Sequence, residues 1–161
     1  MDLRSIFRSL AAGACGSIAH SGLMLLKSSV GLLPGFHPYD DLQRALGDLV
    51  GSAVSPVIPW ALSFLNGSLV LGLLFSRLYP SLPGDSGAAK GVVFGVAGWI
   101  AMGVLAFPLL GQGLFASELG LGLRPALFSL LMLLTYSTIM GMAYSALRTI
   151  RSAAPSNSAR R

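Results

Sequence analysis

The sequence predicts an all-α membrane protein with four transmembrane helices and a short external amphipathic helix between the first and second. Its 161 residues are 53% apolar and 11% charged, with a mean hydropathy of +0.72. Soluble domains carry about 25% charged residues, roughly twice as many. Long uncharged stretches alternate with short segments rich in Pro, Gly and charge. We therefore expect residues 1–150 to form a single four-helix bundle and residues 151–161 to form a disordered basic cytoplasmic tail.

The first predicted helix follows a short basic start. Residues 9–26 carry no formal charge between Arg8 and Lys27, which is long enough to cross a bilayer at about 1.5 Å per residue. A signal peptide is disfavoured because the apolar stretch continues beyond Ala19 without a small-residue cleavage site. The helix is expected to remain in the mature protein and to reach Leu33, before Pro34.

Residues 34–52 differ from the spans around them. They hold three of the six acidic residues, and Pro34 and Pro38 interrupt any regular element. Asp40 or Asp41 can cap a short helix. Its apolar side would consist of Leu42, Leu46, Leu49 and Val50. We expect this helix to lie flat at the external membrane surface.

Three further uncharged stretches predict the remaining spans. The second helix is expected at about residues 57–79 and the third from near Lys90. Pro108 is expected to kink or end the third helix, with the Gly-rich segment after it forming a re-entrant segment or a loop. The fourth helix is expected at about residues 124–147. Each stretch is long enough to cross the membrane.

Small residues predict where the helices pack closely. Arg8 and Lys90 are each followed by Gly five residues later, Gly again after three more, and then Ile-Ala. This echo has two explanations, a duplicated helical hairpin or coincidence in a chain rich in Gly and Leu. Small side chains let helix backbones approach each other in lipid. The predicted helix-packing residues are Gly13, Gly16, Gly91, Gly95, Gly98 and Gly103.

The basic residues predict the orientation. With both termini in the cytoplasm, eight of the eleven lie inside and only Lys27, Arg44 and Arg124 lie outside. Loops with more Lys and Arg normally remain cytoplasmic. The net charge of +5 is therefore attributed to topology and to contacts with membrane lipids rather than to nucleic acid.

Four apolar, loosely specific motifs lie along most of residues 5–148. They are LMLLK with GLLPG (23–35), GLLFSRLYPSLPG (72–84), GVVFGVAGW (91–99) and FPLLGQGLF (107–115). With these motifs the chain resembles a family of small four-helix bacterial inner-membrane proteins whose function is unknown. The resemblance implies the fold and a place in the bacterial inner membrane, and it assigns no catalytic or binding residue.

His20 is the main candidate for cofactor binding, because an ionisable side chain inside a membrane span is a functional hypothesis by default. It could ligate haem or relay protons. The alternative is a structural, neutral imidazole bonded to a hydroxyl or a backbone carbonyl. The only other histidine, His37, belongs to the external segment, so a second haem ligand at the same depth is missing. We therefore favour the structural role and expect no cofactor.

Catalytic and metal-binding motifs are absent from the sequence. It contains no P-loop, no GxSxG and no HExxH, so we expect no enzyme. His37, Asp40, Asp41 and Asp48 are metal-ligand types, but their spacing matches no known site and Pro38 interrupts them. They are better explained as a solvated loop, and no metal site is predicted.

The function expected from the sequence is that of a non-catalytic accessory or structural subunit, which packs against a larger membrane complex or against itself. The first and third helices each carry a stripe of small residues, and we expect one stripe to close the bundle and the other to receive the partner. Outside the membrane, the expected partner contacts are His37, Tyr39, Asp40, Asp41 and Arg44. A small oligomeric transporter or channel is the alternative, and haem binding through His20 is a third.

Overall fold

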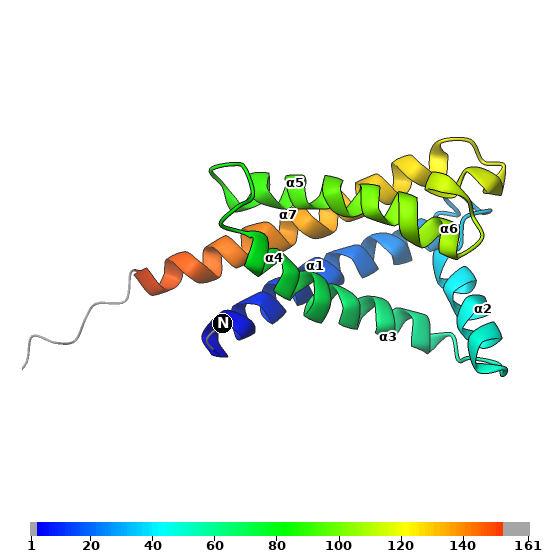
Figure 1. Cartoon of the computed structure of the whole chain (residues 1–161), viewed down its shortest axis with the longest axis horizontal. Helices are drawn as coiled ribbons and strands as arrows, with labels where there is room; N and C mark the ends of the chain where they lie inside the picture. The colour runs from blue at the N-terminus through cyan, green and yellow to red at the C-terminus, as the bar shows by residue number, and fades with distance from the viewer. Residues whose placement is uncertain (1–2, 153–161) are drawn as a thin grey trace, which may run out of the picture.

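The computed structural model describes residues 3–152, which form an all-helical bundle (Figure 1). Four segments are long and apolar enough to cross a membrane. They are Leu3–Ser29, Val57–Leu78, Gly87–Leu109 and Arg124–Thr149. The predicted fold class is therefore confirmed. We call the end where the first span begins and the last one ends the terminal end of the bundle, and the opposite end the α2 end.

The first span is α1 (Leu3–Ser29), and the short helix α2 (Pro38–Val50) crosses the end of the bundle after it (Figure 1). α1 ends before the predicted Leu33 because Gly31 and Leu33 adopt positive φ angles of 63° and 52°. Pro38 lies in the first turn of α2, where its missing N–H costs little. Gly51, with a φ of 69°, ends the helix.

The second span contains a π-helical turn. α3 (Val57–Leu65) continues directly into the π-helix η1 (Asn66–Leu71) and then into α4 (Gly72–Leu78). A π-helix hydrogen-bonds to the fifth residue along, so it widens the helix locally. The predicted limits of 57–79 agree with this span to within one residue.

The third span consists of α5 (Gly87–Ala101), the π-helix η2 (Met102–Ala106) and α6 (Phe107–Leu109). It begins before Lys90 because the Ser86 side chain caps it, accepting a hydrogen bond of 3.1 Å from the amide of Ala89. η2 ends two residues before Pro108, which has no N–H to bond to the previous turn. The span ends at Leu109, as the proline predicted.

A loop that contains the 3₁₀ segment η3 (Leu114–Leu119) connects the third span to α7 (Arg124–Ser152). Its backbone turns through several positive φ angles, including 52° at Phe115 and 61° at Ala116. α7 continues to Ser152, so it includes residues 151 and 152, the first two of the predicted tail. The remainder of the predicted tail, 153–161, lies outside the described residues.

Two contacts between small residues hold the spans in pairs. In the α5–α7 interface, Gly87, Gly91 and Gly95 face Ser137, Gly141 and Ser145. In the interface of α1 with η1 and α4, Ser9 and Gly13 face Ser68 on η1 and Gly72 on α4. Each set repeats every four residues and lets the backbones touch. The two halves are thus two helical hairpins in tandem, joined by the packing of α7 along α1.

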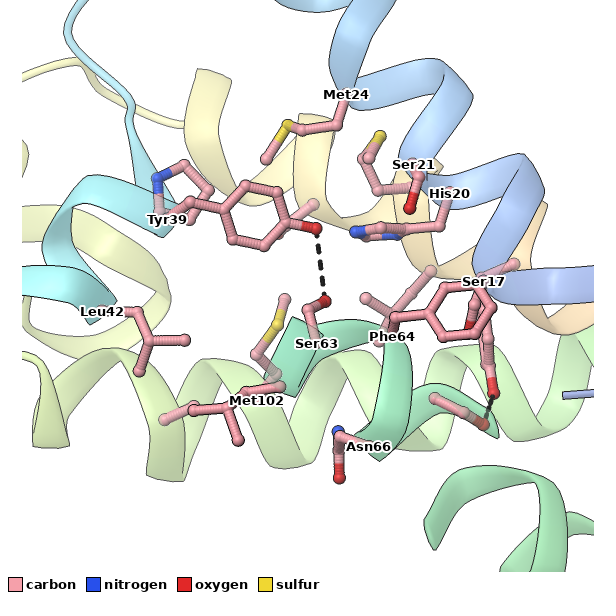
Figure 2. Close-up of a pocket in the computed structure, with 18 of the residues that line it drawn as sticks. Ser17, His20, Ser21, Met24, Tyr39, Leu42, Ser63, Phe64, Asn66 and Met102 are labelled. Atoms are coloured by element: carbon pink, nitrogen blue, oxygen red, sulfur yellow. Dashed lines mark hydrogen bonds between the residues drawn. The ribbon is translucent and has the colours of Figure 1, made fainter. Parts of the chain in front are cut away.

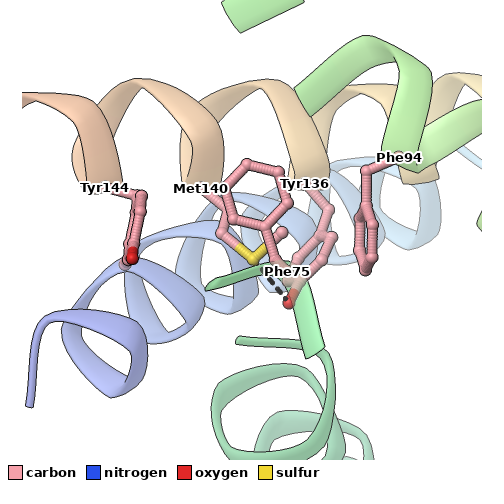
Figure 3. Close-up of a cluster of buried hydrophobic side chains, with 6 residues drawn as sticks. Phe75, Phe94, Tyr136, Met140 and Tyr144 are labelled. Atoms are coloured by element: carbon pink, nitrogen blue, oxygen red, sulfur yellow. Dashed lines mark hydrogen bonds between the residues drawn. The ribbon is translucent and has the colours of Figure 1, made fainter. Parts of the chain in front are cut away.

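An aromatic cluster fills the bundle toward the terminal end (Figure 3). Phe75 on α4 is fully buried, and its ring meets those of Phe94 and Tyr144 edge-to-face at centroid distances of 5.2 and 5.7 Å. Met140 on α7 is also fully buried beside it. The cluster therefore joins both hairpins through α4, α5 and α7.

Candidate ligand-binding pocket

A pocket of about 450 Å³ lies inside the bundle toward the α2 end (Figure 2). α1, the α3–η1 segment, the η2–α6 segment and α7 form its walls, and α2 covers it from outside the spans. Most of the lining is apolar, including Met24, Phe107, Phe128 and Met132. Its size and its few polar groups are typical of a small-molecule site.

One face of α1 supplies polar side chains to this pocket. Ser17, His20, Ser21 and Met24 recur at the spacing of a single helix face and all line the pocket. Ser17 is only 4% exposed, and its hydroxyl has no hydrogen-bond partner among the described residues. A buried hydroxyl without a partner is costly, and Ser17 therefore leaves an unused hydrogen-bonding group beside the pocket.

His20 points from α1 into the pocket, toward the wall formed by α2 and α3 (Figure 2). A neutral imidazole carries one donor and one acceptor nitrogen, so His20 offers the pocket a group that can donate or accept a hydrogen bond.

Tyr39 and Ser63 form the polar side opposite His20 (Figure 2). Their oxygen atoms are 3.2 Å apart, and the Tyr39 ring packs on Trp60 at a centroid distance of 4.3 Å. Burial raises the pKa of the Tyr39 phenol above its usual value, more than the hydrogen bond with Ser63 lowers it. The phenol therefore remains protonated at neutral pH and can donate a hydrogen bond.

Both π-helical turns contribute to the pocket. Asn66, Gly67 and Leu71 line it from η1, and Met102 and Ala106 line it from η2. The Tyr136 hydroxyl donates a 2.6 Å hydrogen bond to the Gly67 carbonyl, which fixes η1 against α7. π-helical turns occur frequently at functional sites.

Hydrogen bonds from three segments hold α2 over the pocket. The Lys27 ammonium group donates to the carbonyl of Phe36 at 2.5 Å, just before α2. The Gln112 amide donates to the Asp41 carboxylate at 2.6 Å, from the loop before α7. Together with the Tyr39–Ser63 contact, these bonds close the pocket at the α2 end.

The pocket opens sideways. α3 packs against α1, α2 and η1, but within residues 3–152 it has no extended contact with η2 or α6. Figure 1 shows α3 diverging from these segments. Leu62 and Phe64, which line the pocket from α3, remain 41% and 38% exposed. The opening lies along the transmembrane segments and therefore faces lipid.

The five residues expected to contact a partner lie in different environments. Tyr39 faces the pocket, and Asp41 bonds Gln112 and pairs with Arg44 at 3.1 Å. His37 hydrogen-bonds the Pro34 carbonyl and lies 3.7 Å from Asp40. The side chains of His37 and Asp40 are 53% and 69% exposed. The surface of α2 away from the pocket thus presents His37, Asp40 and Arg44.

The six glycines expected at helix contacts differ in how closely they approach other helices. A Cβ atom at Gly13 would lie 2.7 Å from the Ser68 carbonyl oxygen, and one at Gly16 would lie 2.8 Å from the Tyr136 ring. Gly91 and Gly95 face Ser137, whereas Gly103 faces the Phe115 ring of the following loop. At Gly98 the nearest neighbour is a Leu133 methyl group at 3.4 Å, an ordinary contact. Gly13, Gly16, Gly91 and Gly95 are therefore covered within the chain.

Sequence reasoning missed several residues at these contacts and in the pocket. Gly67, Gly72, Gly87 and Gly141 all lie against neighbouring backbone or side-chain atoms. The four-residue spacing Ser137, Gly141, Ser145 was a readable signal for the α5–α7 interface. Tyr39 and Ser63 had no such signal, because they are distant in sequence and meet only in the folded chain.

Fold and pocket together define a class: a multi-pass α-helical membrane protein with a pocket inside its bundle. Residues 3–154 match the family of unknown function DUF6789, and the chain belongs to that family. This confirms the resemblance to a family without known function. Comparison with curated proteins and with solved structures found no match.

Proposed function

We propose that this protein is a non-catalytic membrane protein that binds a lipophilic small molecule with a neutral polar end. The observation that carries the proposal is the pocket of about 450 Å³, apolar over most of its lining and open sideways between α3 and η2. A molecule dissolved in the bilayer reaches such an opening without crossing water. Its apolar part would lie against Met24, Phe107 and Phe128.

The polar groups define which end of the ligand the pocket would recognise. His20, Tyr39 and Ser63 lie on facing walls and offer both donors and acceptors (Figure 2). Among the described residues that line the pocket, none is Arg or Lys. A carboxylate or phosphate would therefore lack a counter-charge, which is costly away from water. The proposed ligand class is a lipid-soluble molecule with a carbonyl or hydroxyl group.

The test is to identify what the protein retains. The full chain is purified from its native membranes in mild detergent, and extracted small molecules are measured by mass spectrometry together with a visible spectrum. Ser21→Phe would fill the pocket, and Ser28→Phe is the matched control, because it lies two turns further along α1 and is exposed. We expect Ser21→Phe to retain at least tenfold less of a lipophilic molecule than Ser28→Phe.

Three outcomes would contradict this proposal. Equal retention by both variants would show that the molecule binds elsewhere. A water-soluble anion retained in the pocket would contradict the neutral, lipophilic class. A Soret band lost in His20→Ala would reassign the pocket to haem, the third function expected from the sequence.

An accessory role in a larger complex is the second candidate, and the exposed face of α2 favours it. His37, Asp40 and Arg44 point away from the pocket and leave polar groups at the α2 end for a partner. The glycines within the spans support an accessory role less, because Gly13, Gly16, Gly91 and Gly95 already contact other helices of the same chain and are not available to a partner helix. A stoichiometric larger subunit in the same purification would support this role.

We also propose the bacterial inner membrane as the location, with both termini in the cytoplasm. The proposal rests on the cations at the terminal end, among them Arg8, Arg77, Lys90 and Arg148. The α2 end would then face outward.

Single-cysteine labelling tests this orientation. Cys15 is exposed, so it is first replaced by Ala, and cysteines are then introduced at Asp40 and at Asp85. Both positions are exposed and lie at opposite ends of the bundle. We expect an impermeant maleimide to label position 40 in intact cells and position 85 only after permeabilisation. Labelling of both positions in intact cells would contradict the topology.

A further inference from the structure

A second cavity, of about 290 Å³, lies at the terminal end, where α1 begins and α4 and α7 end. Whereas the larger pocket is mostly apolar, this cavity is lined mainly by basic and hydroxyl-bearing side chains. The lining consists of Ser5, Arg8, Ser76, Tyr79, Pro80, Tyr144 and Arg148. Two guanidinium groups and several hydroxyl groups thus converge between helices that are distant in sequence.

Within residues 3–152, the basic side chains around this cavity form no ion pair. The Arg148 guanidinium lies over the Tyr79 ring at 5.0 Å, and the Lys90 ammonium group lies 4.7 Å from the same ring. Among the described residues, the ion pairs within 4.0 Å all belong to α2 at the other end of the bundle. Arg8, Lys90 and Arg148 therefore concentrate charge that an anion would stabilise.

The aromatic side chains give the cavity a fixed shape. Lys90 donates a 2.7 Å hydrogen bond to the Tyr79 carbonyl, and the Tyr79 and Tyr144 rings pack at 4.9 Å. Tyr144 is only 7% exposed, yet its hydroxyl forms no hydrogen bond within the described side chains and lines the cavity. A hydroxyl group that lines a cavity together with two arginines is suited to donate a hydrogen bond to an anionic oxygen.

We propose that this cavity binds a phosphate-bearing anion. Arg8 and Arg148 would donate to its oxygen atoms, and the Tyr144 hydroxyl would add a third donor. Arginine is the preferred residue for phosphate because its planar group donates two parallel hydrogen bonds. The cavity lies where the spans end, at the level of lipid headgroups, so a phospholipid headgroup and free phosphate share the required chemistry. This proposal is independent of the one for the larger pocket.

Thermal unfolding of the full chain in neutral detergent tests it with three probes: dioleoyl phosphatidylglycerol, dioleoyl phosphatidylcholine and inorganic phosphate. We expect phosphatidylglycerol to raise Tm at concentrations where phosphatidylcholine does not. Arg8→Gln and Arg148→Gln should each require about tenfold more phosphatidylglycerol for the same shift. Tyr144→Phe should weaken the response while it retains the packing of the ring.

Arg77→Gln is the matched control, because Arg77 is an exposed cation at the same end that does not line the cavity. Stabilisation by inorganic phosphate as well as by phosphatidylglycerol would identify a site open to free phosphate, and stabilisation by the lipid alone a headgroup site. Two results would overturn the proposal: equal responses to phosphatidylglycerol and phosphatidylcholine without any response to phosphate, or Arg77→Gln weakening the response as much as Arg148→Gln.

Discussion

Gly141→Ala is expected to separate α7 from α5 and to cost about 3 kcal/mol of stability, near the upper end for overpacked sites. A Cβ atom at Gly141 would lie 3.0 Å from the Gly87 carbonyl carbon and 3.1 Å from the Gly91 Cα, and closer still to the Gly87 carbonyl oxygen. These atoms are backbone, so no side chain can rotate to relieve the contact. The helices must move apart and lose the packing that holds the second hairpin together.

Gly22→Ala is the control for this prediction. Gly22 is also helical, but a Cβ atom there would meet nothing within 4 Å. Alanine favours helix by up to about 1 kcal/mol over glycine, so this variant should be unchanged or more stable. In the measurement, SDS is titrated into the protein in mild detergent, and unfolding is monitored by circular dichroism. Similar midpoints for Gly141→Ala and Gly22→Ala would contradict the backbone contact between α5 and α7.

Phe75→Ala is expected to destabilise the protein by about 3 kcal/mol, the lower end of the range for buried phenylalanines. Phe75 is fully buried and touches rings from both hairpins, so its removal leaves a cavity that no single helix can fill. Lipid is as apolar as the side chain itself, so the loss arises from packing rather than from transfer out of water.

The same titration compares Phe75→Ala with Phe7→Ala. Phe7 lies on α1 and is 69% exposed, so its truncation removes few contacts within the chain. We expect the Phe7 variant to unfold close to the wild-type midpoint. If truncation at position 7 proves as damaging as truncation at position 75, the aromatic cluster does not join the hairpins as described.

The spans could be predicted because they depend on a local property of the sequence. An uncharged stretch between Arg8 and Lys27 is sufficient to locate α1, and breakers such as Pro108 locate an end. Helix boundaries that depend on backbone conformation were predicted less accurately. The positive φ angle of Gly31 ended α1 early, and the Ser86 cap started α5 early.

The register of the helix pairs could not be read from the sequence echo. The echo aligns Gly13 with Gly95, both five residues after a cation. In the fold, Gly13 lies against Gly72 and Gly91 lies against Gly141. Gly72 packs on Ser9 and Gly13 in the same way that Gly141 packs on Gly87 and Gly91, so Gly13 corresponds to Gly91, one four-residue step from Gly95. Small residues that repeat every four positions allow several registers, and the larger side chains around them select one.

The pocket was only partly predictable. His20 was recognised because an ionisable residue in a span is unusual. Tyr39, Ser63 and Met132 reach it from three other elements, and the π-helical turns that bring η1 and η2 to the pocket follow from no simple pattern. α2 was correctly expected as an amphipathic helix, but its role as a cover depends on hydrogen bonds from Lys27 and Gln112 that no sequence pattern indicates, and Gln112 is remote from α2 in sequence.

The sideways opening between α3 and η2 changes how occupancy of the larger pocket is counted. A molecule that enters from lipid is distributed in two dimensions, so its relevant concentration is its mole fraction among the lipids and not its amount in the surrounding water. A weak site can then be filled by a minor membrane component. Added detergent or lipid lowers that mole fraction without any change in the protein, so retention by the Ser21→Phe and Ser28→Phe variants has to be compared at one fixed ratio of detergent to protein.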